Sequence, residues 1–471
     1  MSGVLMSRTL RKGAQVAYRS ARLKDEKPDM IATLLEGPCK DIAQAKTKLD
    51  EKLGPLTPSK IDDLTQGLFG RRVWKDYDSV MREHEAAIEQ ILRVLFSIDR
   101  AQGNTIFGER AKILDACGGT GTVEQIVSRI VGQFRFDRMD STIVDFSKFM
   151  TDSARSKLRG KVRTVEHNML TDEAIPVHDG FDVAILSQAL PFLFDRSEKI
   201  KSAEPEHVRN ANAHKVVRMR VLQKLVDKLH NDGHLIIIDE TPMKYSLHGN
   251  KPAEILRQLI FEITTDLVNK GEVEEIVRGL NTGGGIELQF AADVTVPIDG
   301  RHDMYVMVFR KKANIEAAVV RNDPRYDNAR SEARRKVVEI YRRIDADITG
   351  GKIHFPAIGD IVEISDLNAV AGYRGNGSVA LVDVIHRVNN GNRLKMLEGL
   401  VDQIPTGKAL IIVDEFPTAR GEEFPGALST SQFRGLMSTR FGKQMVQVGA
   451  VANPISSEVE NIMIGYEFRK L

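Results

Sequence analysis

The stretch ILDACGGTG, from Ile113 to Gly121, constrains the fold of this chain more than any other feature. Apolar residues lead into Asp115, and a turn of small residues follows directly. Glycine has no Cβ, so such a turn can adopt positive φ and let a ligand approach the main chain. A helical pattern over residues 123–131 comes next, and the first amides of a helix can bind a ligand. We therefore expect a strand, a glycine loop and a helix N-terminus that together bind a cofactor.

Two common cofactor loops do not fit this stretch. A dinucleotide loop requires G-x-G-x-x-G, and its third glycine position is Glu124 here. A phosphate-binding loop requires Lys after its last glycine, and no Lys follows Gly121. The pattern Asp-x-Gly-x-Gly-x-Gly does fit, except that Cys117 replaces its first glycine.

That pattern resembles the first motif of the class I S-adenosylmethionine-dependent methyltransferases. In that family the strand-end acid and the glycine loop hold the methionine and ribose parts of the cofactor. A β-branched strand over residues 142–144 ends at Asp145, which matches the family's second motif, and a carboxylate there can accept hydrogen bonds from ribose hydroxyls. Ser147 is a predicted helix N-cap. A helix-capping role is the alternative for Asp145.

Three later segments continue the resemblance in order. Asn168 stands where the family usually has the Asp that contacts adenine, and Met169 lies either against the adenine or in the core. Ser187 and Gln188 follow an apolar strand over residues 181–186, at the strand end where α/β proteins bind ligands, although a solvated turn is the alternative. Asp239 and Glu240 follow the next strand.

The resemblance covers about residues 70–312. It implies an antiparallel hairpin, residues 286–296 and 304–312, at the edge of the sheet, and S-adenosylmethionine as the cofactor. The cofactor-binding residues that we predict are Asp115, Cys117, Gly118, Gly119, Gly121, Asp145, Phe146, Asn168, Met169 and Ser187. The sequence assigns no catalytic residue; the candidates for the acceptor side are Ser187, Gln188, Asp239 and Glu240.

The predicted fold class is α/β. It combines a Rossmann-like class I methyltransferase sheet with a helical N-terminal extension and a second, partial α/β methyltransferase-like module. We predict a helical N-terminal arm and lid region (1–100), a cofactor-binding methyltransferase domain (101–312), a basic helical linker (313–350) and a degenerate methyltransferase-like C-terminal module (351–471).

The C-terminal module is predicted from a partial repeat. Residues 392–417 parallel residues 220–242, since both contain a leucine-rich helix, a glycine turn, a Leu-Ile-Ile strand and Asp-Glu. Residues 378–388 and 461–471 parallel the strands that begin near residues 181 and 303. No second glycine loop follows a strand and an acid. We expect no cofactor site there, and a structural or oligomeric role and a substrate-recognition role both stay open.

Composition and the N-terminus limit the partners. The net charge of +2 does not require a nucleic-acid partner, no run of 18 apolar residues predicts a membrane span, and no His/Cys cluster has metal-ligand spacing, so we predict no metal. Residues 1–24 contain basic residues and no acid. They fit a mitochondrial transit peptide, or an arm that contacts RNA, an acidic partner or another subunit. A homo-oligomer, if one forms, is expected through the C-terminal module. We favour a cytoplasmic location.

The predicted function is methyl transfer from S-adenosylmethionine to an O, N or C nucleophile of a small molecule. The alternative is a catalytically inactive, methyltransferase-like scaffold protein in a larger complex, such as a ribonucleoprotein. A nucleic-acid methyltransferase would carry an Asn/Asp-Pro-Pro-aromatic clamp after the strand at 181–186, and residues 187–192 do not supply one.

Overall fold

The computed structural model describes residues 42–68, 71–102, 106–201, 211–240, 259–281, 286–298, 303–313, 325–350, 361–365, 369–370, 373, 377–388, 390–417, 428, 430–454 and 461–470. The basic N-terminal arm predicted over residues 1–24 lies outside these ranges. Among the described helices, none is long and apolar enough to cross a membrane.

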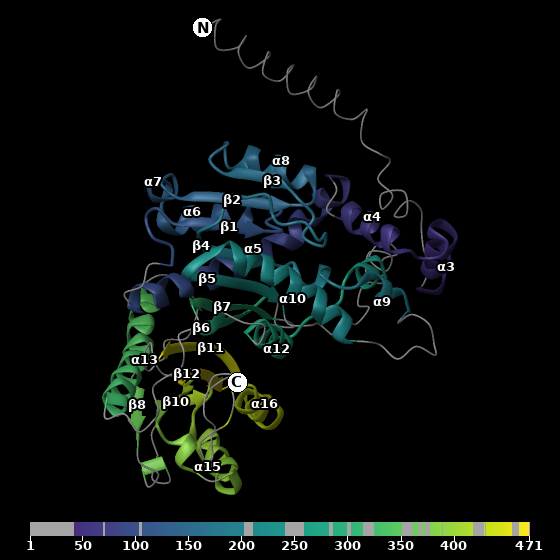
Figure 1. The fold of residues 1–471 in the computed structure, drawn as a ribbon. Helices are drawn as coiled ribbons and strands as arrows, with labels where there is room; N and C mark the ends of the chain where they lie inside the picture. The colour runs from purple at the N-terminus through teal and green to yellow at the C-terminus, as the bar shows by residue number, and fades with distance from the viewer. Residues whose placement is uncertain are drawn as a thin grey trace, which may run out of the picture.

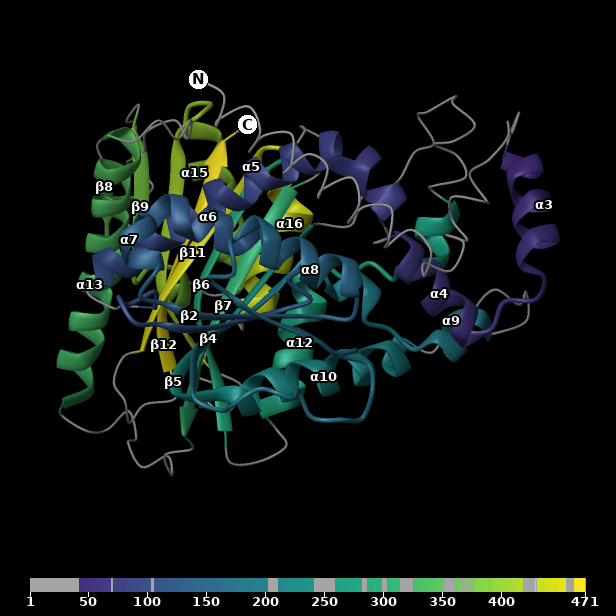
Figure 2. The ribbon, with the colours of Figure 1, turned by 90° about the horizontal axis from the view of Figure 1, so that it is seen from above.

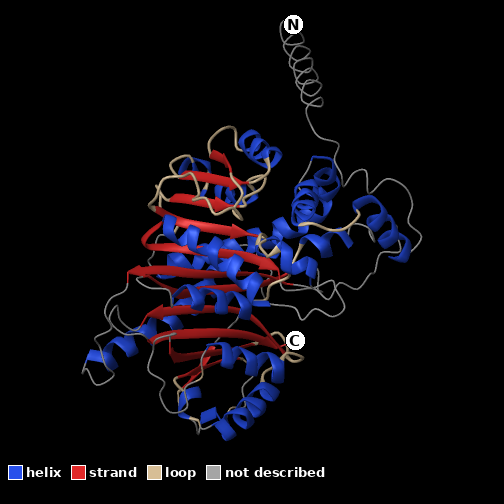
Figure 3. Cartoon of the chain, turned by 45° about the vertical axis from the view of Figure 1, so that its right-hand side comes forward, coloured by secondary structure: helices blue, strands red, loops and turns tan. Residues whose placement is uncertain are grey.

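The strands of the described chain form one continuous twelve-stranded sheet, in the order β3-β2-β1-β4-β5-β7-β6-β11-β12-β10-β9-β8 (Figures 1 and 3). The strands are β1 (Lys112–Ala116), β2 (Asp140–Asp145), β3 (Arg163–Glu166), β4 (Phe181–Ser187), β5 (Leu229–Glu240), β6 (Ile286–Pro297), β7 (Asp303–Ala313), β8 (Ile361–Ile364), β9 (Ser378–Val382), β10 (Ala409–Pro417), β11 (Met445–Pro454) and β12 (Asn461–Lys470).

The first seven strands have the arrangement that the sequence predicts, with one correction. Strands β3, β2, β1, β4 and β5 are parallel, and β7 and β6 follow as an antiparallel pair. The apolar run of β4 is buried, as a parallel strand covered on both faces requires. The hairpin of β6 and β7 does not end the sheet, however. The prediction that it forms a sheet edge is wrong, because β11 pairs with β6.

The second half of the sheet repeats the strand order of the first. Strand β9 is parallel to β8 and β10, β10 is antiparallel to β12, and β12 is antiparallel to β11. The sequence β8-β9-β10-β12-β11 therefore has the same order and directions as β1-β4-β5-β7-β6. We call residues 71–313 the first module and residues 325–470 the second module. Descent of the second module from a methyltransferase stays a prediction.

The two modules join edge to edge. Strand β6 of the first module pairs antiparallel with β11 of the second, with Asp293 opposite Ala450. Every step from β5 through β7, β6, β11 and β12 to β10 reverses the strand direction. Five reversals leave β10 running opposite to β5. The carboxyl ends of β9 and β10 therefore lie at the opposite edge of the sheet from those of β4 and β5.

Helices cover both faces of the sheet; Figure 2 shows α6 and α10 on opposite sides of the first module's strands. The helices are α3 (Ile42–Leu53), α4 (Pro58–Leu68), α5 (Arg71–Gln102), α6 (Thr122–Val131), α7 (Gln133–Phe136), α8 (Lys148–Lys157), α9 (Arg196–Lys201), α10 (Ala211–Lys228), α12 (Lys270–Asn281), α13 (Arg325–Gly350), α15 (Asn390–Gln403) and α16 (Thr430–Phe441), with the 3-10 turns η1 (Leu190–Phe192) and η2 (Ile385–Arg387).

One hydrophobic core runs across both modules on one face of the sheet. It includes Leu92 and Leu95 of α5, Val337 and Tyr341 of α13, and strand residues of both modules. The other face has a separate core in each module, under α10 and α12 and under α15 and α16. Helix α13 lies in the segment 313–350 that we predict to be a basic helical linker, and its residues Val337 and Tyr341 are buried in this shared core.

Candidate functional site

The glycine loop follows β1. It packs closely against Asp115 and Leu158 on one side, while no atom lies near the Cβ position of Gly119. A Cβ added at Gly118 would lie 2.4 Å from Oδ2 of Asp115, and one added at Gly121 would lie 2.7 Å from Cδ1 of Leu158. Gly119 has a φ of +55°, and no atom lies within 4 Å of its Cβ position. The loop therefore requires glycine on its inner side and exposes its main chain at Gly119, where a ligand can approach.

Asp145 ties this loop to the end of β2. Its Oδ2 accepts the main-chain amide of Gly119 at 3.1 Å, and its Oδ1 accepts that of Ser147 at 2.8 Å. Ser147 is the N-cap of α8, as predicted, and its Oγ accepts the amide of Met150. Asp145 is therefore not needed as the cap. Burial raises the pKa of its carboxyl to about 6, and each oxygen retains a lone pair for a ribose hydroxyl.

A pair of buried acids lies below the loop. Asp115 is fully buried and Glu124 is 1% exposed. Glu124 accepts a hydrogen bond from the hydroxyl of Ser141 at 3.1 Å, while the described chain offers the Asp115 oxygens no donor besides the carboxyl of Glu124. Burial, and then the neighbouring Glu124, raise the pKa of Asp115 well above its usual range. Burial and a neighbouring carboxyl both favour the protonated form of Asp115.

Cys117 occupies the family's first glycine position in a left-handed conformation, with a φ of 56°. This conformation costs a non-glycine residue about 1–2 kcal/mol. Burial, together with Asp145 and Asp115, raises the pKa of the Cys117 thiol well above its usual value. A protonated thiol is a poor nucleophile, so this environment does not favour Cys117 as a nucleophile.

The predicted adenine contacts lie beside this loop. Phe146 is half-buried after β2, and exposed Asn168 follows β3. The Oδ1 of Asn168 accepts the amide of Leu170 at 3.0 Å, which fixes the side chain in a turn. Met169 is 3% exposed and packs in the core with Leu114, which favours the packing role over contact with adenine.

The ends of β4 and β5 form the other side of the site. Because Ala116 pairs with Leu186, the glycine loop begins beside Ser187. Gln188 follows with a φ of 51°, and its amide donates to the carbonyl of Ile238 on β5 at 2.7 Å. This left-handed turn leaves Ser187 and Gln188 half-buried at the strand end.

Of the two acids after β5, one supports the main chain and one is more accessible. Asp239 is 2% exposed, and its carboxylate accepts the amides of Leu190 and Glu240. Burial raises its pKa to about 8. Glu240 accepts the side-chain amide of Gln188 at 2.8 Å. Asp239 thus positions the main chain after both strands, while the side chain of Glu240 is 24% exposed at the same strand end.

Comparison with known proteins agrees with this arrangement. No known family model matches the sequence. The chain is 25% identical over 194 residues to a ubiquinone/menaquinone biosynthesis C-methyltransferase, UbiE, of Shewanella halifaxensis, covering 36% of this chain and 73% of the relative. The UbiE protein of Shewanella piezotolerans matches equally.

Solved structures give weaker matches. An O-methyltransferase family protein from Burkholderia thailandensis is 16% identical, with a TM-score of 0.31 and coverage of 58% of this chain and 72% of that one. The plantazolicin methyltransferase BpumL in complex with SAH is 14% identical, with a TM-score of 0.35 and coverage of 56% and 98%. These TM-scores are too low to decide anything. The deciding observation is the strand order β3-β2-β1-β4-β5-β7-β6 with the glycine loop after β1, supported by the UbiE relatives.

The first module has the class I methyltransferase fold. The structure brings the predicted residues of this fold to one edge of the sheet, after strands β1, β2, β3, β4 and β5. They are Asp115, Cys117, Gly118, Gly119 and Gly121; Asp145 and Phe146; Asn168 and Met169; Ser187 and Gln188; and Asp239 and Glu240.

One residue of this edge is not predicted from the sequence. Nε2 of His84, on α5, lies 2.8 Å from Oε1 of Glu240, the same oxygen that accepts from Gln188. His84 is 28 residues before β1 in a long amphipathic helix, so no motif marks it. One sequence signal for His84 is that it is a polar residue close to apolar positions of the same helix, such as Ala87 and Ile88, which are buried.

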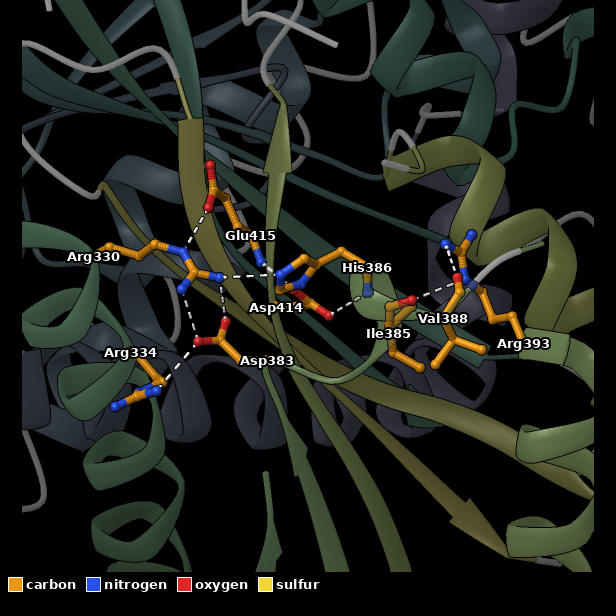
Figure 4. A network of polar contacts seen from close by, with 9 residues as sticks. All are labelled: Arg330, Arg334, Asp383, Ile385, His386, Val388, Arg393, Asp414 and Glu415. Atoms are coloured by element: carbon orange, nitrogen blue, oxygen red, sulfur yellow. Dashed lines mark hydrogen bonds and ion pairs between the residues drawn. The ribbon is translucent and has the colours of Figure 1, made fainter. Parts of the chain in front are cut away.

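The second module contains a polar network at the matching strand ends (Figure 4). Asp383, His386 and Asp414 offer atoms within 4.8 Å of one another, a grouping that could hold a metal ion and that the sequence spacing does not reveal. Arg330, however, donates two hydrogen bonds to Asp383 at 2.9 and 2.7 Å, and Arg334 donates a third. These guanidinium groups already neutralise the carboxylate that a metal would need.

Proposed function

We propose that the chain is a methyltransferase that uses S-adenosylmethionine and methylates an O, N or C nucleophile of a small molecule. The observation that carries the proposal is Asp145, a buried carboxylate at the end of β2 that accepts the amide of Gly119. It links an acid suited to ribose hydroxyls with a glycine loop whose main chain faces open space.

The residues present fit this cofactor. Asp145 would bind the ribose, Gly119 would let the methionine part approach, and Phe146 and Asn168 would contact the adenine. The cofactor supplies a methyl group already activated on a sulfonium. The protein then has to align the acceptor and exclude water, and the strand ends at Ser187 and Gln188 lie beside the loop for this task.

The small-molecule acceptor is favoured over a macromolecule by two observations. The curated relatives are named as quinone-biosynthesis C-methyltransferases, and residues 187–192 lack the acceptor clamp of nucleic-acid enzymes. The scaffold alternative is not favoured, since a purely structural module does not need the loop geometry at Gly118 and Asp145. A homo-oligomer, an RNA contact by the N-terminal arm and a cytoplasmic location stay predictions.

Isothermal titration calorimetry with S-adenosylmethionine tests the proposal. We expect binding by the intact protein and a loss of at least about tenfold in affinity for Asp145→Ala, because a charged hydrogen bond contributes about 1.5–3 kcal/mol. Asp140→Ala is the matched control, since Asp140 begins the same strand at its opposite, exposed end. No binding by the intact protein at millimolar cofactor would support the scaffold alternative.

A further inference from the structure

We propose that the second module holds the acceptor side of the first module in place, with Arg434 of α16 as the positioning residue. This inference rests on the proposed function, which makes the turn after β4 part of the acceptor site. It starts from contacts at the junction of the two modules. Helix α12 precedes β6 as α16 precedes β11, so the two helices take matching places, and they lie next to each other in Figure 1.

Arg434 joins the modules through a buried group of charges. Its guanidinium donates to the carboxylates of Glu274 on α12 and Asp293 on β6. Asp293 is 0% exposed and also accepts from Nζ of Lys270 on α12, at 2.7 Å. Gln447 of β11 accepts from Nε of Arg434 at 3.1 Å and donates to Asp293 at 3.1 Å. A buried charge that loses its partner destabilises a protein strongly, so these contacts hold α12 against the second module.

The segment that leads into α12, residues 265–269, is joined to the turn η1 after β4. The amide of Asp266 donates to the carbonyl of Pro191 in η1 at 2.7 Å. Arg218 of α10 connects the same two segments, because it donates to Oδ2 of Asp266 at 2.7 Å and to the carbonyl of Leu190 at 3.4 Å. Asp266 and Arg218 are 7% and 4% exposed, so little water competes for these contacts.

The start of α12 is a rigid connection between the charge group and this segment. The amide of Asn269 donates to the carboxylate of Glu272 at 2.8 Å, and the amide of Glu272 donates to Oδ1 of Asn269 at 3.0 Å. This reciprocal pair is a capping box, which fixes the direction of the chain at a helix N-terminus. Val268 is 1% exposed and packs in the core of the first module. A shift of α12 would therefore move Asp266 and, with it, η1.

A second route leads from the charge group to the same turn. Nζ of Lys270 lies 5.6 Å from the centre of the Tyr305 ring, and Tyr305 is directly opposite Asp239 in the sheet. Asp239 accepts the amide of Leu190 at 3.2 Å. Both routes thus end at Leu190, the first residue of η1.

The position of η1 matters because methyl transfer depends on alignment. The acceptor atom must lie in line with the methyl group, and a misplacement of about 1 Å can lower the rate by about 100-fold. The contacts described above lead to the turn after β4 and not to the glycine loop at residues 115–121. We therefore expect Arg434 to affect the order of the acceptor side and to leave cofactor binding unchanged.

Hydrogen–deuterium exchange of the full chain, measured by mass spectrometry, tests the inference. In Arg434→Met we expect residues 188–193 and 264–270 to exchange about tenfold faster or more, the effect of losing a hydrogen bond to a charged group. Residues 115–121 should exchange as in the wild type, and calorimetry should show an unchanged affinity for S-adenosylmethionine. A general loss of stability would speed exchange at residues 115–121 as well. Arg434→Lys, which keeps the charge, should exchange more slowly than Arg434→Met.

The matched control is Arg440→Met, which breaks another arginine–carboxylate pair of α16, with Glu398 at 2.8 Å, within the second module. It should leave exchange at residues 188–193 and 264–270 unchanged. If Arg434→Met does not fold, Glu274→Ala removes the same link from the side of α12 while Arg434 keeps Asp293, and it should give the same pattern of exchange.

Three results would overturn the inference while the proposed function stands. They are wild-type exchange at residues 188–193 in the folded variant, an equal increase at residues 115–121, and failure of both Arg434→Met and Glu274→Ala to fold, which would make the charge group purely structural. If the intact protein does not bind S-adenosylmethionine, the proposed function itself fails, whatever the pattern of exchange.

Discussion

The amide of Gly119 and the carboxylate of Asp145 lie 3.1 Å apart and join the loop after β1 to the end of β2. Two segments that are distant in sequence become one surface through this contact. The cofactor affinity of the protein should therefore depend on the charge of Asp145 and on the shape of the loop.

Cofactor affinity should fall at acid pH. The pKa of Asp145 is raised to about 6 by burial, and its ionised form is the better acceptor for ribose hydroxyls. Lowering the pH through about 6 protonates it, and the dissociation constant should then rise up to about tenfold per pH unit. Calorimetry between pH 5 and 8 measures this, and Asp145→Asn should bind weakly with a flatter pH dependence. A wild-type affinity that is constant over this range would contradict the assignment.

Two glycine substitutions should have different effects. Gly118→Ala puts a methyl group 2.4 Å from Asp115, and such overpacking costs about 1–3 kcal/mol of unfolding free energy. Gly119→Ala meets open space and pays only the cost of its left-handed φ, about 1–2 kcal/mol, but its methyl group enters the cofactor space. Urea denaturation should show the larger loss for Gly118→Ala. Calorimetry should show that Gly119→Ala loses cofactor affinity while it remains folded.

Stability should decline as the pH rises from about 4 to about 8 because of Asp239. Burial raises the pKa of Asp239 in the folded protein to about 8, above the ordinary 3.8. A raised folded-state pKa contributes stability that is complete below the unfolded pKa and is lost as the pH rises through about 8. Asp239→Asn cannot titrate, so its unfolding free energy should change less between pH 6 and 9 than that of the wild type. Parallel curves for the two proteins would contradict this.

Cys117→Gly should be tolerated or slightly stabilising. Cys117 has a φ of 56°, and glycine relieves about 1 kcal/mol of strain at such a position while it increases the entropy of the unfolded chain. Cys117→Ala keeps the strain and should be less stable than Cys117→Gly in thermal denaturation. The raised thiol pKa also predicts slow alkylation of the folded wild type by iodoacetamide at pH 8.

The modules should unfold together. A Cβ at Gly465 would lie 2.5 Å from the ring of Tyr341, in the core that joins both modules. Gly465→Ala should therefore lower the unfolding temperature of the whole protein, and calorimetry should show one transition in both proteins. A variant with two transitions, one of them at the wild-type temperature, would show that the modules are independent.

Much of the first module can be predicted from local patterns. The apolar run before Asp115 and the apolar run of β4 each predict a buried strand, and the turns after them follow from glycine or polar residues. The position of β11 cannot be predicted in this way, because a strand edge shows no sequence sign of the strand that will pair with it. The sequence therefore gives the hairpin of β6 and β7 but not its neighbour.

Part of the candidate site can also be predicted from the sequence, and part depends on tertiary packing. Asp115, Asp145 and Glu240 stand at strand ends, which a sequence pattern locates. His84 comes from a helix that crosses the sheet, and its contact depends on packing between distant segments. The burial that raises the pKa of Asp239 also depends on tertiary packing.

The antiparallel pairing of β6 with β11 gives one chain the form of a two-fold dimer of unequal halves. In a dimer of identical subunits, a change at one site is also made at the other. A single chain has no such restriction, so Arg330 contacts Glu415 at one strand end while His84 contacts Glu240 at the matching end. The fused sheet therefore allows the two halves to carry different residues at matching strand ends.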